Sequence, residues 1–418
     1  MQMHTSNKKI QAIVQPDAFR IDVAHAVQLI AKSMPDYGSE RVELVDAAGQ
    51  LLRQRISAER DQPPFDRATM DGIAVNGAEL TNNIREFPIA GIQAAGQAAQ
   101  QLSDSGQCFE VMTGAVMPSG TDTVIPVERI TITAEVATLE EDYQPELGQF
   151  IHRRATDHTQ GDTLLEPGTL IHGPEMAILT AAGEATVEIA QWPRVAIIST
   201  GDELVDVGEA IAEFQIRSSN DRAIEASFQT RGCKRTTRSR LPDDPAALLI
   251  HIRNLHDDND VLILSGGVSM GKYDYVPGIL QELGVRVVFH KILQRPGLPM
   301  WFGVSADNKP VFALPGNPVS TIVCCIRYVI PAITLAMGLP QREPETVLLG
   351  EDVSFEPDLT WFMPVILDCG TDGLTRALPR PTNTSGDFIG LRDTHGFVEL
   401  PRGTNNFAAG YPARLYRW

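Results

Sequence analysis

Residues 260–290 read DVLILSGGVSMGKYDYVPGILQELGVRVVFH. A short apolar run ends in a pair of glycines, a helical stretch follows, and a second apolar run begins directly after the next glycine. Short apolar runs bounded by turn residues are typical of buried strands. The order of strand, turn, helix and strand predicts an α/β sheet with parallel strands.

The same alternation continues on both sides of this stretch. One helical segment opens with Asp243, Asp244 and Pro245, which are typical helix-starting residues. We therefore expect a doubly wound α/β domain over residues 191–341. The sequence predicts strands within residues 194–200, 261–267, 285–293, 300–304 and 310–316, and helices within residues 221–232, 243–257, 276–284 and 317–333.

The remaining segments follow different patterns and predict a multidomain protein of class α/β plus β. Residues 61–149 combine short apolar runs with frequent Pro and Gly, which predicts a β-rich domain. Residues 342–418 predict a small, barrel-like C-terminal β-domain. Residues 150–190 predict a bridge between domains, with a helix over the segment PEMAILTAAG. Within residues 18–57 the sequence predicts a helix, followed by the stretch GSERVELVDAAGQLLRQRI, which mixes a short strand with a second helix.

Composition limits the function classes. The chain has 418 residues, of which 43% are hydrophobic, and a formal net charge of -18. An acidic chain gains little from counterion release, so we expect no nucleic-acid partner. The five cysteines form no CxxC motif, and we expect neither a disulfide framework nor a zinc site. No secretory signal or long uncharged apolar run is visible, which predicts a soluble cytoplasmic protein without a membrane span.

The chemistry-bearing residues follow the predicted strands. Ligands of open α/β sheets bind beyond the carboxyl ends of the strands, where glycine lets the backbone approach them closely. Backbone N–H groups and hydroxyls there suit a phosphate or a pterin ring. The residues expected to bind such a ligand are Gly266, Gly267, Ser269, Pro315, Gly316, Asn317 and Ser320.

Charged residues of the same domain add a metal and an anion hypothesis. Glu203, Asp243 and Asp274 are carboxylates of the type that binds magnesium beside substrate phosphates, although Asp243 also fits a helix cap and Asp274 a solvated loop. Lys291 and Arg295 are candidate anion ligands, and ordinary surface charge is the alternative.

Asp71 and Thr113 lie on glycine-flanked loops of the β-rich segment, where Asp-Gly is also a common turn. The residues themselves therefore predict a phosphate- or nucleotide-like ligand with magnesium-type carboxylates.

Ordered motifs connect these residues to a known family. The segments PPFDRATMDGIAV, VMTGAVMPSGTDTVIPVE, STGDELV, SGGVSMGKYDYV, RPGLPMWFG, LPGNPVS and NTSGDFIGL occur in this order. Together they resemble the molybdopterin molybdenumtransferases, which comprise the bacterial MoeA proteins and the E-domain of gephyrin. The resemblance runs from about Asp61 to the C-terminus.

The resemblance implies a specific reaction. Such enzymes insert molybdenum from molybdate into adenylylated molybdopterin, with magnesium-dependent release of AMP. They are homodimers of elongated subunits with a composite active site, and other cofactor-assembly proteins are possible partners. This implies that residues 1–60 and 150–190 form an elongated bridging and dimerisation domain. The resemblance implies catalytic roles for Asp71, Thr113, Glu203, Asp243 and Asp274, with the last three as magnesium ligands. It also implies anion binding by Lys291 and Arg295, a site hydroxyl at Ser385, and a match of Asp157 to a family aspartate.

The chain departs from the family pattern at a few positions. Arg295 and Leu298 stand where lysines are usual, and Lys272 replaces an acid in the GEADY segment. Arginine keeps the charge with a planar fork of donors, whereas leucine removes a cation. These departures indicate a paralogue with altered affinity or one acting on tungstate as an alternative. Two further alternatives are a molybdopterin adenylyltransferase, whose domain shares the α/β fold, and a non-catalytic molybdopterin carrier or scaffold.

Overall fold

The computed structural model describes residues 20–267 and 275–418. The chain forms two compact units. The larger unit comprises Met1–Arg53, Pro167–Ile171 and Glu188–Trp418, and the smaller unit comprises Gln54–Glu166 and His172–Val187. The division into four domains with the boundaries given above stays a prediction.

The smaller unit contains a six-stranded β-sheet, as expected for a β-rich domain. Its strand order is β7-β4-β6-β5-β9-β8, and all neighbours are antiparallel except β5 and β6. Ile73, Phe87 and Ile125 are fully buried in it and hold the sheet together. Its strands are β4 (Gly72–Val75), β5 (Glu86–Gln93), β6 (Cys108–Val111), β7 (Thr123–Pro126), β8 (Ile130–Thr133) and β9 (Val136–Leu139), with the short helix α2 (Gly77–Thr81) after β4.

A short strand of the smaller unit, β3 (Arg67–Ala68), joins two loops. It pairs with β10 (Ile151–His152) on one side. On the other side, the Ala68 N–H donates to the carbonyl of Ala115 (2.9 Å). The unit also contains β2 (Ile56–Ser57), β11 (Thr163–Leu165) and the helix α3 (Gly173–Ala181), which has Pro in its first turn.

The larger unit contains the expected α/β sheet. Its strand order is β16-β13-β17-β21-β20-β18. The strands β16, β13, β17 and β21 are parallel, whereas β20 is antiparallel to both of its neighbours. The expectation of an entirely parallel sheet was therefore wrong for β20, because only a short turn links β20 to β21 and a parallel pair needs a long crossover. The strands are β13 (Val195–Thr200), β16 (Thr236–Leu241), β17 (Val261–Ser265), β18 (Arg286–His290), β20 (Trp301–Val304) and β21 (Pro310–Leu314).

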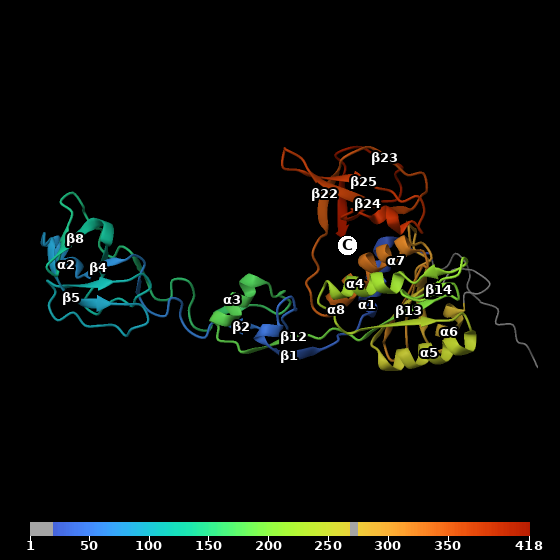
Figure 1. The fold of residues 1–418 in the computed structure, drawn as a ribbon, viewed down its shortest axis with the longest axis horizontal. Helices are drawn as coiled ribbons and strands as arrows, with labels where there is room; N and C mark the ends of the chain where they lie inside the picture. The colour runs from blue at the N-terminus through green and yellow to red at the C-terminus, as the bar shows by residue number, and fades with distance from the viewer. Residues whose placement is uncertain (1–19, 268–274) are drawn as a thin grey trace, which may run out of the picture. The chain divides into compact units, whose positions relative to one another are not determined.

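Helices cover both faces of this sheet (Figure 1). Alternate strand residues divide between two cores: Ile197 and Ile263 pack on one face, and Ile198 and Leu264 on the other. The first face carries α1 (Val23–Ser33), α4 (Asn220–Gln229), α7 (Pro318–Cys324) and α8 (Ile330–Ala336), and the second carries α5 (Pro245–Asp258) and α6 (Val276–Glu282). The doubly wound arrangement is confirmed.

The helix at Pro318–Ala336 combines α7, a π-helical turn at Cys325–Val329, and α8. It is long and apolar enough to cross a membrane by length and composition alone, with a mean hydropathy of 1.9. However, 67% of this stretch is buried inside the protein. The core helix of an α/β fold has the same length and composition, and this helix packs in the core of the larger unit.

The C-terminal segment closes into a small β-barrel. The strands pair in the order β24-β25-β22-β28-β26, and β26 pairs back with β24. The two-residue strand β19 (Gln294–Arg295) pairs with β24 and connects the α/β part to the barrel. The expected barrel-like β-domain is therefore confirmed, with the strands β22 (Glu345–Leu349), β24 (Thr360–Cys369), β25 (Thr375–Pro379), β26 (Gly396–Leu400) and β28 (Pro412–Arg417).

The N-terminal segment contains the expected first helix and short strand, but the second helix expected within residues 38–56 does not form. The first helix is α1, which Asp22 caps by accepting from the N–H of His25 (2.7 Å). Beyond Met34 the chain is extended and forms β1 (Ser39–Glu43), which pairs with β12 (Thr186–Ala190). Pro35 and Gly38 follow the end of α1, and neither residue continues a helix.

Candidate functional site

Three strand ends converge at the carboxyl edge of the α/β sheet. The backbone turns directly after β13, β17 and β21, at Gly201, Gly266 and Gly316. A Cβ added to Gly266 would lie 2.7 Å from the carbonyl oxygen of Thr200, and one added to Gly316 would lie 3.5 Å from the Cα of Gly266. The turns are therefore in close contact, and Gly266 has no room for a side chain.

Asn220 holds two of these strand ends together. Its Nδ2 donates to the Ser265 hydroxyl (2.8 Å) and to the Gly316 carbonyl (2.8 Å). The Thr321 hydroxyl donates to the carbonyl of Pro315 (2.5 Å). The two turns are thus fixed by side chains of α4 and α7 before any ligand binds.

A loop of the C-terminal segment reaches the third turn. The Asn317 Nδ2 donates to the Ser385 hydroxyl (2.8 Å), and the Val319 N–H donates to the Ser385 carbonyl (3.0 Å). The structure therefore brings together Asn317 and Ser385, which were both predicted as site residues. Ser320, in contrast, is 3% exposed within α7. Its predicted role in ligand binding stays a prediction.

Two buried hydroxyls at this edge have no hydrogen-bond partner in the part of the chain that the structure describes. They belong to Ser199 and Thr200, which are 2% and 5% exposed. An unsatisfied buried polar group costs about 1–3 kcal/mol. The Thr200 Oγ1 lies 3.0 Å from the position of a Cβ on Gly267. Sequence reasoning missed Thr200, whose one signal is its place at the end of an apolar strand, and missed Asn220 as well.

The acidic residues lie on adjoining loops at the same edge. The Asp243 N–H donates to the Asp202 carboxylate (3.1 Å), which joins the loop after β16 to the loop after β13. A Cβ added to Gly201 would lie 2.6 Å from the Glu203 carboxylate, so this carboxylate lies directly against the glycine. Within residues 20–267 and 275–418, no three His, Cys, Asp or Glu residues are grouped as a metal site. Asp274 and Ser269 lie outside the described residues.

The predicted anion ligands lie at the junction with the barrel. Arg295 is exposed on β19, next to β24, and its neighbour Gln294 is fully buried. The Tyr328 hydroxyl donates to the Gln294 side chain, which itself donates to the carbonyl of Pro296 (3.0 Å). These bonds fix the backbone on both sides of Arg295. Lys291 has a positive φ of 78° and donates its N–H to the Met300 carbonyl (2.8 Å).

The smaller unit carries the predicted loop residues. The Thr113 N–H (2.6 Å) and hydroxyl (2.8 Å) both donate to the Asp71 carboxylate. The sequence predicted both residues but not this contact between them. These two hydrogen bonds, the backbone one first, hold the pKa of Asp71 below its usual range. Asp157 accepts a hydrogen bond from His152 (3.0 Å). Sequence reasoning did not select His152, which no motif distinguishes from other histidines.

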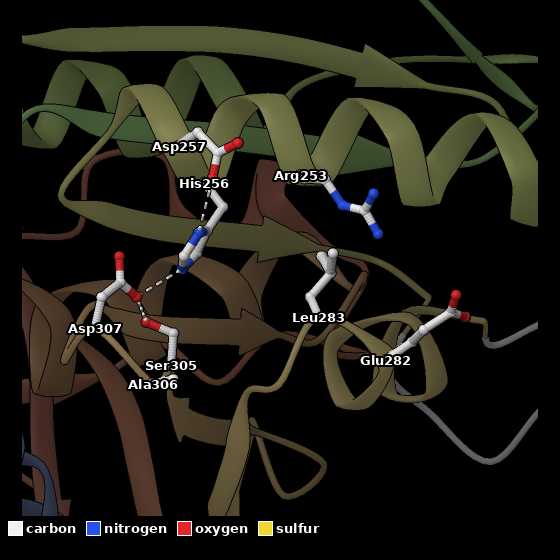
Figure 2. Close-up of a pocket in the computed structure, with 8 residues that line it drawn as sticks. All are labelled: Arg253, His256, Asp257, Glu282, Leu283, Ser305, Ala306 and Asp307. Atoms are coloured by element: carbon white, nitrogen blue, oxygen red, sulfur yellow. Dashed lines mark hydrogen bonds and ion pairs between the residues drawn. The ribbon is translucent and has the colours of Figure 1, made fainter.

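A separate hollow of about 330 Å³ lies at the opposite edge of the α/β sheet (Figure 2). Its lining comes from the C-terminal ends of α5 and α6 and from the turn between β20 and β21. It holds a serine, a histidine and an aspartate, but the Ser305 hydroxyl donates to Asp307 (2.5 Å), and His256 faces Asp307 at 3.5 Å. No serine–histidine pair forms among these residues, so they do not constitute a hydrolase triad.

Known proteins resemble this chain over nearly its full length. Residues 21–183 match the family described as "MoeA N-terminal region (domain I and II)", residues 196–334 match "Probable molybdopterin binding domain", and residues 346–418 match "MoeA C-terminal region (domain IV)". The molybdopterin molybdenumtransferase of Synechocystis sp. is 37% identical over 399 residues, covering 95% of this chain and 100% of that protein. That of Staphylococcus aureus is 29% identical and covers 94% of each chain.

Solved structures agree with the sequence matches. A molybdopterin biosynthesis protein, moeA, from Pyrococcus horikoshii superimposes with a TM-score of 0.79 at 28% identity. The superposition covers 95% of this chain and 99% of that one. A second moeA structure from the same species has a TM-score of 0.81 at 24% identity and supports the fold.

Proposed function

The chain belongs to the molybdopterin molybdenumtransferase family, and we propose that it inserts molybdenum from molybdate into adenylylated molybdopterin, with magnesium-dependent release of AMP. The observation that carries this proposal is the convergence of three glycine turns at one sheet edge, within the segment that matches a molybdopterin-binding domain. We place this activity in the cytoplasm.

The glycine turns suit the phosphate and pterin parts of the substrate. Gly266, Gly267 and Gly316 let the backbone turns pack closely at one edge, and Thr200 offers a buried hydroxyl without a described partner. A phosphate oxygen or a pterin polar atom would satisfy that hydroxyl and remove its desolvation cost. Asn317 and Ser385 would line the same edge from α7 and from the barrel side.

Magnesium fits the carboxylates at this edge. Glu203 and Asp243 lie on loops joined through Asp202, and magnesium commonly uses one or two carboxylates together with substrate phosphates and water. Glu203, Asp243 and Asp274 would hold the ion. When bound, the ion would neutralise charge on the phosphate oxygens as AMP leaves.

Cations would bind the second substrate. Molybdate is a doubly charged oxyanion, and the fork of Arg295 can donate two hydrogen bonds to its oxygens. The rigid backbone around Arg295, fixed by Gln294, would keep the guanidinium in place. Lys291 would add charge, and tungstate has the same shape and charge, so it is the competing oxyanion.

The family resemblance extends the proposal to a homodimer with a composite site. In this arrangement, Asp71 and Thr113 of one subunit face the glycine turns of the other. The hydrogen bonds from Thr113 support a role in the site, because they keep Asp71 ionised and oriented. Asp157 belongs to the same proposed set.

The test is an AMP-release assay with purified protein, adenylylated molybdopterin, molybdate and magnesium. We expect AMP and active cofactor in equal amounts, and less AMP when tungstate replaces molybdate. Formation of adenylylated molybdopterin from ATP and molybdopterin would instead identify an adenylyltransferase. Tight substrate binding without AMP release would identify a carrier, and either outcome would overturn the proposal.

A further inference from the structure

A chain of polar side chains crosses the pairing of β3 with β10 in the smaller unit. His152 and Arg67 are register partners in this pairing. The Arg67 Nη2 lies 3.1 Å from the Nδ1 of His152, and the Nε2 of His152 lies 3.0 Å from the Oδ1 of Asp157. One imidazole ring therefore connects a guanidinium to a carboxylate.

The chemistry of the two neighbours determines where the proton of His152 lies. A guanidinium has donors and no acceptor, so the Nδ1 that faces Arg67 must be unprotonated. An ionised carboxylate only accepts, so the Nε2 that faces Asp157 must carry the hydrogen. The neutral tautomer with hydrogen on Nε2 satisfies both contacts, and no other form of the ring does.

The two arginines that follow His152 in the sequence form hydrogen bonds with other carboxylates. The Arg153 Nη1 donates to Asp66 (2.7 Å), and the Arg154 Nε donates to Asp61 (2.6 Å). The described partners of the His152 ring are therefore Arg67 and Asp157. The carboxylate of Asp157 uses one oxygen for His152, and its side chain remains 45% exposed. That exposed carboxylate can accept a hydrogen bond from a bound molecule.

The short strand β3 also connects these polar side chains to the loop that carries Asp71. Ala68 in β3 donates to Ala115, and Gly114 donates to Ala68 (2.8 Å), so the loop that contains Thr113 pairs with β3. Asp71 follows β3 by a few residues and accepts from Thr113. The carboxylates of Asp71 and Asp157 are thus both anchored through β3, in one part of the smaller unit.

We propose that Arg67 fixes His152 in its neutral, Nε2-protonated tautomer, and that His152 thereby positions the Asp157 carboxylate for the transfer reaction. This inference rests on the proposed function, because Asp157 belongs to the proposed site. His152 acts through Asp157 and is a positioning residue. Hydrogen-bonded partners of metal-binding residues typically change activity by about 10- to 100-fold when removed, and we expect an effect of the same order for a partner that orients the Asp157 carboxylate.

The tautomer is measured on the wild-type chain by nitrogen NMR of ¹⁵N-histidine. The chain has 9 histidines, and the His152 signals are assigned by their loss in His152→Gln. We expect a protonated Nε2 and an unprotonated Nδ1 at neutral pH, and we expect Arg67→Met to populate the other tautomer. A protonated Nδ1 in the wild-type protein would overturn the inference.

Kinetics test the positioning role. His152→Phe keeps the ring shape without either hydrogen bond, and we expect kcat for AMP release to fall by at least about tenfold. His152→Gln places a donor where Nε2 lies, and we expect it to restore most of kcat. His251→Phe, on the exposed surface of α5, is the matched control and should leave kcat unchanged.

The outcomes separate the two proposals. Absence of AMP release by the wild-type enzyme would overturn the proposed function and this role with it. An active wild-type enzyme with unchanged kcat in a folded His152→Phe variant would overturn the positioning role alone. Loss of kcat in both His152→Phe and His152→Gln, with unchanged thermal unfolding, would also overturn it, because the donor would then not be what matters.

Discussion

The side-chain amide of Asn317 donates a 2.8 Å hydrogen bond to the hydroxyl of Ser385, 68 residues later in the chain. The carbonyl of Ser385 also accepts from the N–H of Val319, at the start of α7. The C-terminal segment is therefore attached directly to a strand-end turn of the α/β sheet. The C-terminal β-domain thus takes part in forming the proposed substrate site.

A double-mutant cycle tests this attachment. We expect Asn317→Ala and Ser385→Ala to be non-additive in free energy of unfolding by roughly 0.5–1 kcal/mol, the usual net value of such a hydrogen bond. We also expect each variant to raise KM for adenylylated molybdopterin. Ser354 and Asn406 form a comparable exposed pair (2.8 Å) and serve as the control. Additive effects at Asn317 and Ser385 would contradict the attachment.

The glycine turns give a second prediction. Gly267 has a φ of +66°, and a Cβ there would lie 2.8 Å from the Val276 side chain and 3.0 Å from the Thr200 hydroxyl. Gly267→Ala therefore adds a steric conflict to the strain of about 1–2 kcal/mol for a left-handed alanine. Gly284 also has a positive φ (+78°) but open space around its Cβ position.

We expect Gly267→Ala to weaken substrate binding strongly, as measured by calorimetric titration. Gly284→Ala should lower the free energy of unfolding through strain alone and leave the Kd unchanged. Equal substrate affinity in the two variants would show that the turn after β17 does not contact the ligand.

Adjacent carboxylates give a third prediction, on magnesium. Asp243 and Asp244 follow one another, but Asp244 caps α5 by accepting from the N–H of Ala247 (2.7 Å). Asparagine caps helices as well as aspartate does. We therefore expect Asp244→Asn to leave magnesium dependence unchanged. Asp243→Asn should raise the magnesium concentration that gives half-maximal AMP release by roughly 10- to 100-fold. The same midpoint in both variants would exclude Asp243 as a ligand.

The sequence predicted most of the α/β sheet for a physical reason. Buried parallel strands such as β13 and β17 are continuous apolar runs, and helix starts such as Asp244–Pro245 have a local signature. The direction of β20 was missed although the sequence contains a signal for it, since the connection of residues 305–309 to β21 is too short for a parallel crossover. Within residues 18–57 the first helix and the short strand were predicted correctly, but the second helix expected after the strand does not form.

The candidate site was predictable where glycine marks a turn, and less so where side chains meet. Ser385 and Asn317 were both expected from motifs, but their contact was not. Thr200 and Asn220 were not predicted, because threonine at the end of a strand and asparagine at the start of a helix are common in proteins without a functional role. Arg67 and His152 are 85 residues apart, and only the pairing of two short strands joins them.

A buried ion pair between the core helix and the barrel gives a fourth prediction. The Arg327 Nε donates to Glu399 (3.0 Å), and the two side chains are 11% and 15% exposed. Breaking a buried pair costs about 3–5 kcal/mol, because one charge remains without its partner. We expect Glu399→Gln to lower the free energy of unfolding by this amount in urea.

The matched control is Glu345→Gln, in the same barrel. Glu345 pairs with Arg417 (2.9 Å), but these side chains are 47% and 52% exposed. Exposed pairs contribute about 0–1 kcal/mol. Similar losses in the two variants would mean that the Arg327 pair is as well solvated as the surface pair.

The fifth prediction concerns Asp71 and pH. Two donors of Thr113 lower the pKa of Asp71, the backbone N–H more than the hydroxyl. Thr113→Val removes the hydroxyl and keeps the N–H, so we expect the pKa of Asp71 to rise part of the way toward its usual value. Carboxyl-carbon NMR through a pH titration measures this change directly.

The sign of the stability effect follows from the lowered pKa. Because the folded-state pKa is below the unfolded one, the hydroxyl's contribution is fully present above an unfolded pKa of about 3.9. It is lost as the pH falls through the folded-state pKa. The difference in unfolding free energy between wild type and Thr113→Val should therefore shrink in acid. Thr121→Val is the control, because Thr121 donates to the Pro118 carbonyl (2.7 Å), which does not titrate, so its effect should not change with pH. If the pKa of Asp71 is the same in Thr113→Val as in the wild type, the backbone N–H alone lowers the pKa of this carboxylate.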